Sequence, residues 1–428
     1  MDGFAQTTLP NGLRVVTQPM RGAQTVAVAV SVDVGSRYEG ADENGISHML
    51  EHMAFKGTER RNAKQIAEEM DAIGASFNAF TSSESTVYYA RLVPEDLPLA
   101  VDLLADILQH STFDAEEMER ERGVILQEIA AHTDTPDDLA FDFFHEVAYP
   151  NQPLGRSILG TPELVSGFAA ENLSDYMRKH YHADNMVLSV AGNVEHERVV
   201  KLAQDAFGEL EKGDEDKPLP IHYGGGEKRE ARQFEQMHVT LGFPGVSYHD
   251  PDYYAAQVMV TALGGGMSSR LFQEVREKRG LAYSVHGFMS AYSDGGIFGV
   301  YAASSEARGA ELMPVLCDSI AELAEKGISE EELSRAKRQH MTGLKMQSEH
   351  VSSVSEWLGR HTICYGEFRD LESMLSRYER VQAADVQRAL TRMLQSGPPS
   401  LAVVGPHAGL TEYERIVAHF ASYHSDAA

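Results

Sequence analysis

Two histidines and a glutamate in one short segment are the residues of this chain that most directly indicate chemistry. The segment reads His48-Met49-Leu50-Glu51-His52. On a helix this spacing places both imidazoles on one face, one turn apart, where they can bind the same divalent metal, usually zinc. Glu51 lies beside His52 on the polar side and need not bind the metal, so it is free to take a proton from metal-bound water. The order His-x-x-Glu-His is the inverse of the commoner metalloprotease motif.

The same five residues could also belong to an amphipathic helix that merely carries solvated histidines. Apolar residues around them recur at the spacing of one buried helical face: Ile46, Met49, Leu50 and Met53. Gly57 is a residue at which such a helix can end. Because a catalytic zinc needs three protein ligands and an open position for water, a third ligand would separate the two interpretations.

An acidic segment further along the chain offers two candidates for that third ligand. Residues 119–129 predict a helix that carries Glu121 and Glu128. They are seven positions apart and therefore share a face two turns distant. Spacing does not choose between them, since either could simply be a solvated carboxylate.

The elements that must position these residues are readable from the pattern. Valines that alternate with small or polar residues predict a strand over 26–34. Beyond the histidine helix we predict, in order, a helix from an Asn62 cap to Gly74, a hairpin of strands 76–81 and 86–92, a helix over 94–110, and a helix from an Asp114–Glu117 capping box to about 131.

The two halves of the chain share one order of elements. The strand at 187–192 and the helix after it correspond to a strand and a helix within 401–420. The strand at 86–92 and the helix after it correspond to residues 296–323, and the helix that begins at Asp114 corresponds to one that begins near 329. We therefore predict the α+β class with two duplicated domains, each a mainly antiparallel sheet with helices packed on one face. Residues 252–257 take the place of the histidine helix without a histidine pair, so only one half is expected to bind metal.

A charged, proline-containing segment at 211–220, followed by glycines at 224–226, is typical of an interdomain linker. It divides the chain nearly in half. We predict an N-terminal catalytic domain over 1–212, a linker over 213–234, and a C-terminal domain of the same fold over 235–428.

Composition bounds the possible functions. A chain of 428 residues with 43% hydrophobic and 24% charged residues is typical of a globular protein of two to four domains. The net charge of −27 argues against nucleic acid and against anionic membrane surfaces. Two cysteines cannot form a disulfide framework. With no visible secretory signal and no membrane-spanning apolar run, we expect a cytoplasmic location.

Three features together resemble one family. The histidine pentad, the segment Gly-Ala-Ser-Phe-Asn-Ala-Phe-Thr-Ser at 74–82, and Glu128 placed 76 positions after His52 are similar to the pitrilysin-type metallopeptidases with the inverted zinc motif. More narrowly, the half-length chain and the segment 264–285 resemble the branch that includes the beta subunit of the mitochondrial processing peptidase and its bacterial homologues. The resemblance extends over essentially the whole chain.

The resemblance assigns roles to the candidate residues. It implies one zinc per chain, held by His48, His52 and Glu128, with Glu121 as an acidic neighbour that supports the site. Glu51 becomes the general base.

Further site residues follow from the same resemblance. Asn78, Ala79 and Phe80 match the family's substrate strand, where an extended peptide can pair with an open sheet edge. Arg276 and Tyr283 match an arginine and a tyrosine that the family places at the active site from a different domain, where either could stabilise an oxyanion.

The function implied is that of a zinc metalloendopeptidase that hydrolyses peptide bonds in short or unfolded peptides. The half-length chain implies a homodimer with a shared active-site chamber, peptides as substrates, and no nucleic-acid or membrane partner. Two alternatives remain at this point: a non-catalytic structural core subunit of the same fold, and an obligate partner of a second, different chain.

Overall fold

The computed structural model describes residues 3–213 and 217–424. The chain forms two compact units that exchange segments along the sequence. The first unit comprises Met1–Ala130, Ser157–Leu219 and Lys345–Glu372, and the second comprises Ala131–Arg156, Pro220–Leu344 and Ser373–Ala428. The predicted division at 213–234 stays a prediction, part of which (214–216) lies outside the described residues; the compact units differ from it in the exchanged segments.

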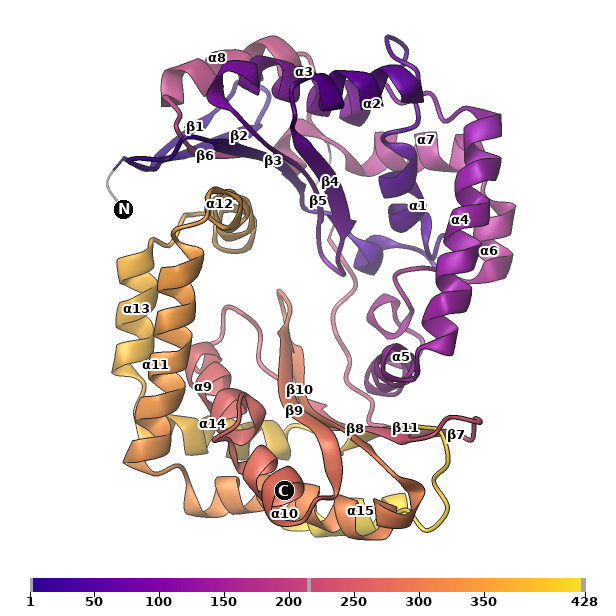
Figure 1. Ribbon diagram of the computed structural model, residues 1–428, viewed down its shortest axis with the longest axis vertical. Helices are drawn as coiled ribbons and strands as arrows, with labels where there is room; N and C mark the ends of the chain where they lie inside the picture. The colour runs from indigo at the N-terminus through magenta and orange to yellow at the C-terminus, as the bar shows by residue number, and fades with distance from the viewer. Residues whose placement is uncertain (1–2, 214–216, 425–428) are drawn as a thin grey trace. The chain divides into compact units, whose positions relative to one another are not determined.

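The first unit is built on a six-stranded sheet (Figure 1). Its strands, in spatial order, are β1 (Ala5–Thr8), β2 (Arg14–Pro19), β6 (Met186–Gly192), β3 (Val26–Val32), β5 (Thr86–Leu92) and β4 (Ser76–Thr81). All neighbouring pairs are antiparallel except β2 and β6, which run parallel. The predicted hairpin is therefore present, and its strand β4 lies at an edge of the sheet.

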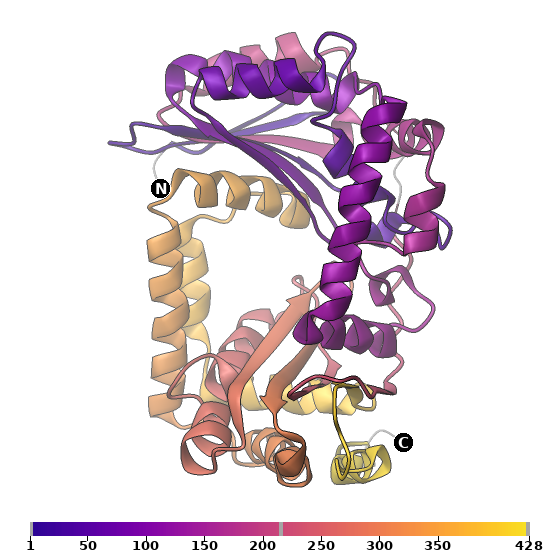
Figure 2. The ribbon, with the colours of Figure 1, turned by 45° about the vertical axis from the view of Figure 1, so that its right-hand side comes forward.

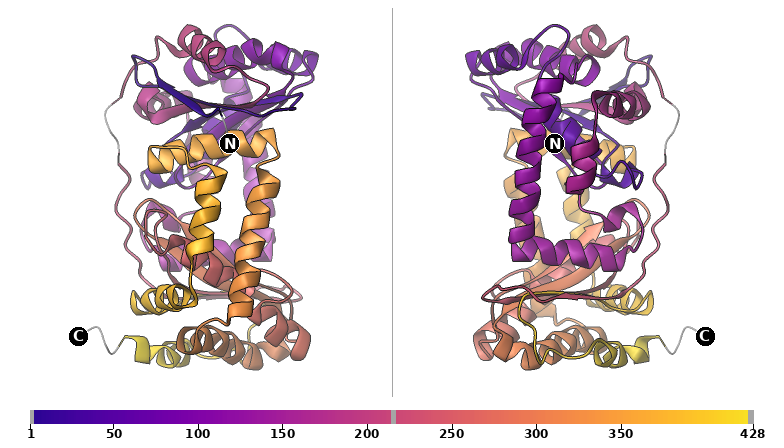
Figure 3. Two further views of the ribbon diagram at one scale, coloured as in Figure 1. Left: turned by 90° about the vertical axis from the view of Figure 1, so that its left-hand side faces the viewer. Right: turned by 90° about the vertical axis from the view of Figure 1, so that its right-hand side faces the viewer.

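Helices cover both faces of this sheet. On one face lie α3 (Leu97–Gln109) and α8 (His196–Phe207), and on the other lies α12 (Val351–Tyr365), as Figures 1 and 3 show. Every residue of β3 is buried for this reason. The small residues that alternate with its valines let α12 approach closely: a Cβ added to Gly359 would lie 2.4 Å from Oγ of Ser31.

The second unit repeats this arrangement on a five-stranded sheet. Its spatial order is β7 (Gly226–Glu230), β11 (Ser400–Val404), β8 (Met237–Pro244), β10 (Gly296–Ser304) and β9 (Ala282–Ala291), with β7 and β11 parallel and the other pairs antiparallel. The order matches that of β2, β6, β3, β5 and β4. The predicted α+β fold with two duplicated sheets is confirmed, whereas the prediction that helices pack on one face of each sheet is wrong, because helices cover both faces.

The second sheet is likewise covered on both faces. Helices α9 (Tyr253–Gly264), α10 (Gly309–Lys326) and α14 (Ala383–Gln395) lie on one face and α5 (Pro136–Ala148) lies on the other (Figure 2). Within β11, Leu401 and Val403 belong to the core on the first face, and Ala402 and Val404 belong to the core under α5. Successive strand residues point to opposite faces. Helix α5 from the first half of the chain thus packs on the second sheet, and α12 from the second half packs on the first sheet.

Five of the remaining helices were predicted and have shifted ends: α1 (Ile46–Met53), α2 (Ala63–Ala72), α4 (Ala115–Asp134), α11 (Glu330–Gln347) and α15 (Tyr413–His419). Three more had no counterpart in the prediction: α6 (Pro162–Gly167), α7 (Ala170–His180) and α13 (Leu371–Arg380). Asn62 caps α2 through a reciprocal pair of hydrogen bonds with Gln65. Helix α1 ends at Met53, four residues before Gly57. None of the helices in the described ranges combines the length and apolar character that a membrane crossing requires.

Candidate metal centre

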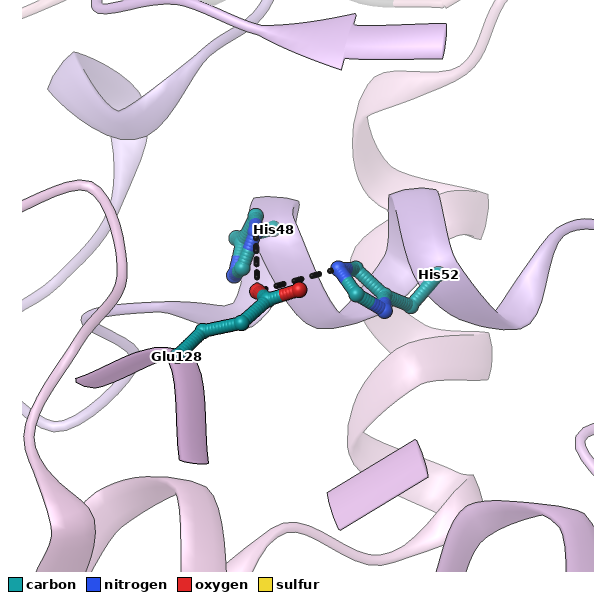
Figure 4. A group of neighbouring side chains, drawn as sticks. All are labelled: His48, His52 and Glu128. Atoms are coloured by element: carbon teal, nitrogen blue, oxygen red, sulfur yellow. Dashed lines mark ion pairs between the residues drawn. The ribbon is translucent and has the colours of Figure 1, made fainter. Parts of the chain in front are cut away.

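Helices α1 and α4 bring the two histidines and one glutamate together in the first unit (Figure 4). The carboxylate oxygen Oε2 of Glu128 lies 3.6 Å from Nε2 of His48 and 3.5 Å from Nε2 of His52. One ligand atom from each residue lies within 4.8 Å of the others. Both histidines are largely buried, whereas the Glu128 side chain is 43% exposed, so the group has a closed and an open side.

A second glutamate fixes the orientation of His52. Oε2 of Glu121 lies 3.1 Å from Nδ1 of His52, and its Oε1 lies 2.6 Å from Nζ of Lys56. Burial raises the pKa of Glu121, but the hydrogen bonds from Lys56 and His52 outweigh it and hold that pKa below its usual value. The ionised carboxylate can only accept, so Nδ1 of His52 donates to it, and in the neutral imidazole Nε2 is then the nitrogen with a lone pair for a metal.

The group fits a divalent cation. Nε2 of His52 and Nε2 of His48 both lie toward the carboxylate of Glu128, and a metal ion bound there would take the place of a proton between these atoms. Burial and the neighbouring His52 lower the pKa of His48 to about 4, so the His48 imidazole is neutral near pH 7 and can bind a metal. Its Nδ1 is buried without a hydrogen-bond partner among the described residues. Two imidazoles and a carboxylate that converge in this way match the donor set of a catalytic zinc site.

Glu51 lies on the same helix and is held by the neighbouring strand. The hydroxyl of Thr81, the last residue of β4, donates to Oε2 of Glu51 at 2.7 Å. Burial raises the pKa of Glu51, and the hydrogen bonds from Thr81 oppose that rise. A partly desolvated carboxylate next to the group is suited to exchange a proton with a water molecule there.

The start of α1 is held by a buried carboxylate from the preceding loop. Gly45, the N-cap of α1, has no side chain, and its φ is 96°. The carboxylate of Glu39, which is 2% exposed, accepts instead from Nδ2 of Asn44 at 3.1 Å and from the backbone N–H groups of Gly45 and Ser47, both at 2.9 Å. A Cβ on Gly45 would lie 2.7 Å from the backbone of Gly160, so only glycine fits.

The three residues predicted to bind substrate lie on the edge strand β4. Asn78 and Phe80 are exposed, whereas Ala79 points into the core. β4 pairs with β5 along one side only and is the last strand of its sheet. Helix α1 packs against it, so the edge lies next to the helix that carries the histidines.

Arg276 and Tyr283 lie together in the second unit. The Arg276 guanidinium stacks on the ring of Tyr283, 4.2 Å from its centroid, and on the ring of Phe272 at 4.8 Å. Arg276 comes from the π-helical segment Phe272–Lys278, and Tyr283 from the start of β9. Tyr283 is 76% exposed. Their role in catalysis stays a prediction.

Sequence reasoning gave no role to three residues that shape this site. Lys56 lies four residues after His52, and that spacing is a signal that could have placed it beside the histidines. Thr81 lies in the strand predicted over 76–81, but nothing in the sequence pairs it with Glu51. Glu39 leaves no signal in the sequence, because it bonds mainly to backbone groups.

Comparison with known protein families gives two matches. Residues 14–162 match the family described as Insulinase (Peptidase family M16), and residues 167–340 match the family described as Peptidase M16 inactive domain. The second match covers most of the half in which α9 stands in place of the histidine helix.

Curated relatives match nearly the whole chain. An uncharacterized zinc protease of Rickettsia felis is 42% identical over 407 residues, which are 95% of this chain and 98% of the relative. An uncharacterized zinc protease of Streptomyces coelicolor is 40% identical over 411 residues, 94% of this chain and 89% of the relative. One from Bacillus subtilis is 36% identical over 404 residues, 94% and 98% of the two chains.

Two solved structures share the fold. A peptidase M16 inactive domain from Pseudomonas fluorescens superposes with a TM-score of 0.88 at 21% identity, over 96% of this chain and 99% of that one. A protease from Helicobacter pylori superposes with a TM-score of 0.87 at 22% identity, over 94% and 99% of the two chains.

Proposed function

The chain belongs to the M16 family of peptidases, and from this premise we propose that it is a zinc metalloendopeptidase that hydrolyses peptide bonds in short or unfolded peptides. The observation that carries the proposal is the convergence of His48, His52 and Glu128 beside a partly buried Glu51. One zinc per chain would be held by these three residues. Its curated relatives carry the name zinc protease.

The residues divide the chemistry between them. Zinc held in this group would lower the pKa of a water molecule and polarise the scissile carbonyl. Glu51 takes the proton of the attacking water and returns it to the leaving amine. Glu121 keeps the His52 ring in the tautomer that presents Nε2, and Lys56 keeps Glu121 ionised.

The substrate is an extended peptide that pairs with β4. An edge strand has free backbone N–H and C=O groups, and a peptide can add to them as a further strand. Asn78, Ala79 and Phe80 are the residues along which it would lie. Main-chain pairing demands an extended backbone and reads little of the sequence.

This mode of binding predicts that folded proteins escape cleavage. With zinc present, the protein should hydrolyse short peptides and a reduced, unfolded protein, and leave the native form of that protein intact, because a native chain cannot offer an unpaired strand. Mass spectrometry of the products would give both rate and cleavage sites. Equal rates on the native and unfolded forms would contradict strand addition, and no cleavage of any peptide would contradict the proposed function itself.

The alternative of a non-catalytic subunit remains testable by the same assay. Such a subunit would keep the two sheets and lack turnover. The presence of His48, Glu51, His52 and Glu128 together favours the enzyme.

The cytoplasmic location stays a prediction.

We further propose a homodimer in which the site is shared. In the branch that the chain resembles, half-length members pair, and the arginine and tyrosine serve the zinc from the facing half. The exposed ring of Tyr283, on which the half-buried Arg276 stacks, is accessible to a partner. In this arrangement they would stabilise the oxyanion at the zinc site of the partner chain, in trans.

Mixing two inactive variants tests the shared site. Glu51→Gln and Tyr283→Phe should each be nearly inactive, whereas a mixture in which subunits exchange should regain activity. A mixed dimer has one site that combines an intact Glu51 with the partner's intact Tyr283. At equal amounts and random pairing, about a quarter of all sites are restored.

The control for this mixture uses a chain with both substitutions. Glu51→Gln mixed with the doubly substituted chain offers no intact Glu51 and should stay inactive. Differently tagged chains show whether mixed dimers form. Mixed dimers as inactive as either parent would refute the shared site.

A further inference from the structure

Thr81 stands where the metal-binding helix and the peptide-binding strand meet. It is the last residue of β4 and pairs with Thr86 of β5 across the ladder. The turn that follows is fixed by Ser82, whose N–H and hydroxyl both donate to the carbonyl oxygen of Ser85 at 2.8 Å. Thr81 therefore has a well-defined backbone position at the end of the edge strand.

The hydroxyl of Thr81 has two acceptors within reach, and geometry favours one. Its Oγ1 lies 2.7 Å from Oε2 of Glu51 and 3.5 Å from the carbonyl oxygen of Ser47. A hydroxyl has one proton to donate, and the shorter, charge-assisted bond to a carboxylate is the stronger. It engages one carboxylate oxygen of Glu51, so the second oxygen stays available for a proton.

We propose that Thr81 is the positioning residue for Glu51 and ties the orientation of this base to the strand on which the substrate lies. The proposal rests on the proposed function, in which Glu51 is the base. A glutamate side chain has three rotatable bonds, and Glu51 leaves the helix on the side that faces β4. Without a fixed donor, its carboxylate would sample several rotamers, of which few meet the attacking water.

The position of Thr81 also links peptide binding to proton transfer, because one strand serves both. A peptide that pairs with Asn78, Ala79 and Phe80 is positioned by hydrogen bonds to the backbone of β4. Thr81 is the next residue of the same strand. The same strand therefore positions both the scissile bond of the peptide and the carboxylate of Glu51. A small displacement of a catalytic group can cost on the order of 100-fold in rate.

The structure offers a matched control directly across the ladder. Thr86 is the same residue type, paired with Thr81, and its hydroxyl donates to the carbonyl oxygen of Val34 at 2.9 Å. A Thr→Val substitution removes a hydroxyl of the same kind at either position and keeps a β-branched side chain that suits a strand. Only the change at Thr81 frees Glu51.

The test compares Thr81→Val, Thr81→Ser and Thr86→Val in zinc-loaded protein. For Thr81→Val we expect kcat to fall roughly 10- to 100-fold with KM and zinc content unchanged, because the strand and the metal group stay intact. Thr81→Ser keeps the donor and should recover most of kcat. Thr86→Val should keep the parental kcat. In crystals of metal-free Thr81→Val protein, the Glu51 side chain should occupy more than one rotamer.

Several results would overturn the inference while leaving the proposed function in place. They are a parental kcat in Thr81→Val, an equal fall in Thr81→Val and Thr86→Val, a fall that Thr81→Ser shares, and a loss of zinc. Failure of the proposed function differs, because then the parental protein itself would cleave no peptide.

Discussion

Replacement of Glu51 by glutamine is expected to slow peptide hydrolysis by orders of magnitude while the protein keeps its zinc. Glutamine has nearly the same shape and its amide oxygen can still accept from Thr81, so local packing should survive. The amide cannot take a proton from water. General-base catalysis contributes roughly 100- to 10,000-fold, and kcat should fall by about that factor.

The measurement pairs a peptide-cleavage assay with the zinc content per chain. Glu43→Gln is the matched control: its carboxylate lies in the loop before α1, accepts from the backbone N–H of Gly40 at 3.0 Å and is not a member of the group of His48, His52 and Glu128. It should retain the parental rate. Zinc-loaded Glu51→Gln protein that turns over at the parental rate would show that another group is the base. A variant without zinc would show that Glu51 acts on the metal group instead.

Local periodicity was enough to predict the elements that carry the site. The pair His48 and His52 follows from helix geometry alone, because residues four apart share a face. The hairpin of β4 and β5 was equally local. The position of β4 at the edge of the sheet could not be predicted from local periodicity, because the pattern of one strand does not specify which strands pair with it.

The exchange of α5 and α12 could not be predicted from pattern. Each is amphipathic or apolar enough to be buried, but a buried face does not specify which sheet it meets. In β3, the small residues Ala27, Ala29 and Ser31 between valines suggested one covered face. They face α12 instead of water, so their size reflects close helix packing.

The distant parts of the site show the same limit. Glu128 lies 76 positions after His52, and only the family resemblance chose it over Glu121. The structure places Glu128 beside both Nε2 atoms and Glu121 behind His52. Chain segments brought together by the fold leave no spacing signal in the sequence.

Removal of both histidines, His48→Ala with His52→Ala, is expected to eliminate zinc binding and with it all hydrolysis. The remaining carboxylate of Glu128 is 43% exposed on its side chain, and a single solvated carboxylate binds zinc weakly. Glu121→Gln should act more mildly, by roughly 10- to 100-fold in zinc affinity, because it removes the partner that orients His52 and not a ligand.

Thermal unfolding gives a readout of this prediction that needs no substrate. Zinc at about a hundredfold its dissociation constant stabilises a folded protein by about 2.7 kcal/mol, so the parental melting temperature should rise on adding zinc, and that of the double variant should not. His110→Ala, which removes an exposed histidine outside the group, should respond as the parent does. Full zinc occupancy in the double variant would refute the assignment. If His110→Ala lost zinc as well, the metal would bind nonspecifically. A surface imidazole would then contribute as much to zinc binding as His48 and His52, which α1 holds toward Glu128.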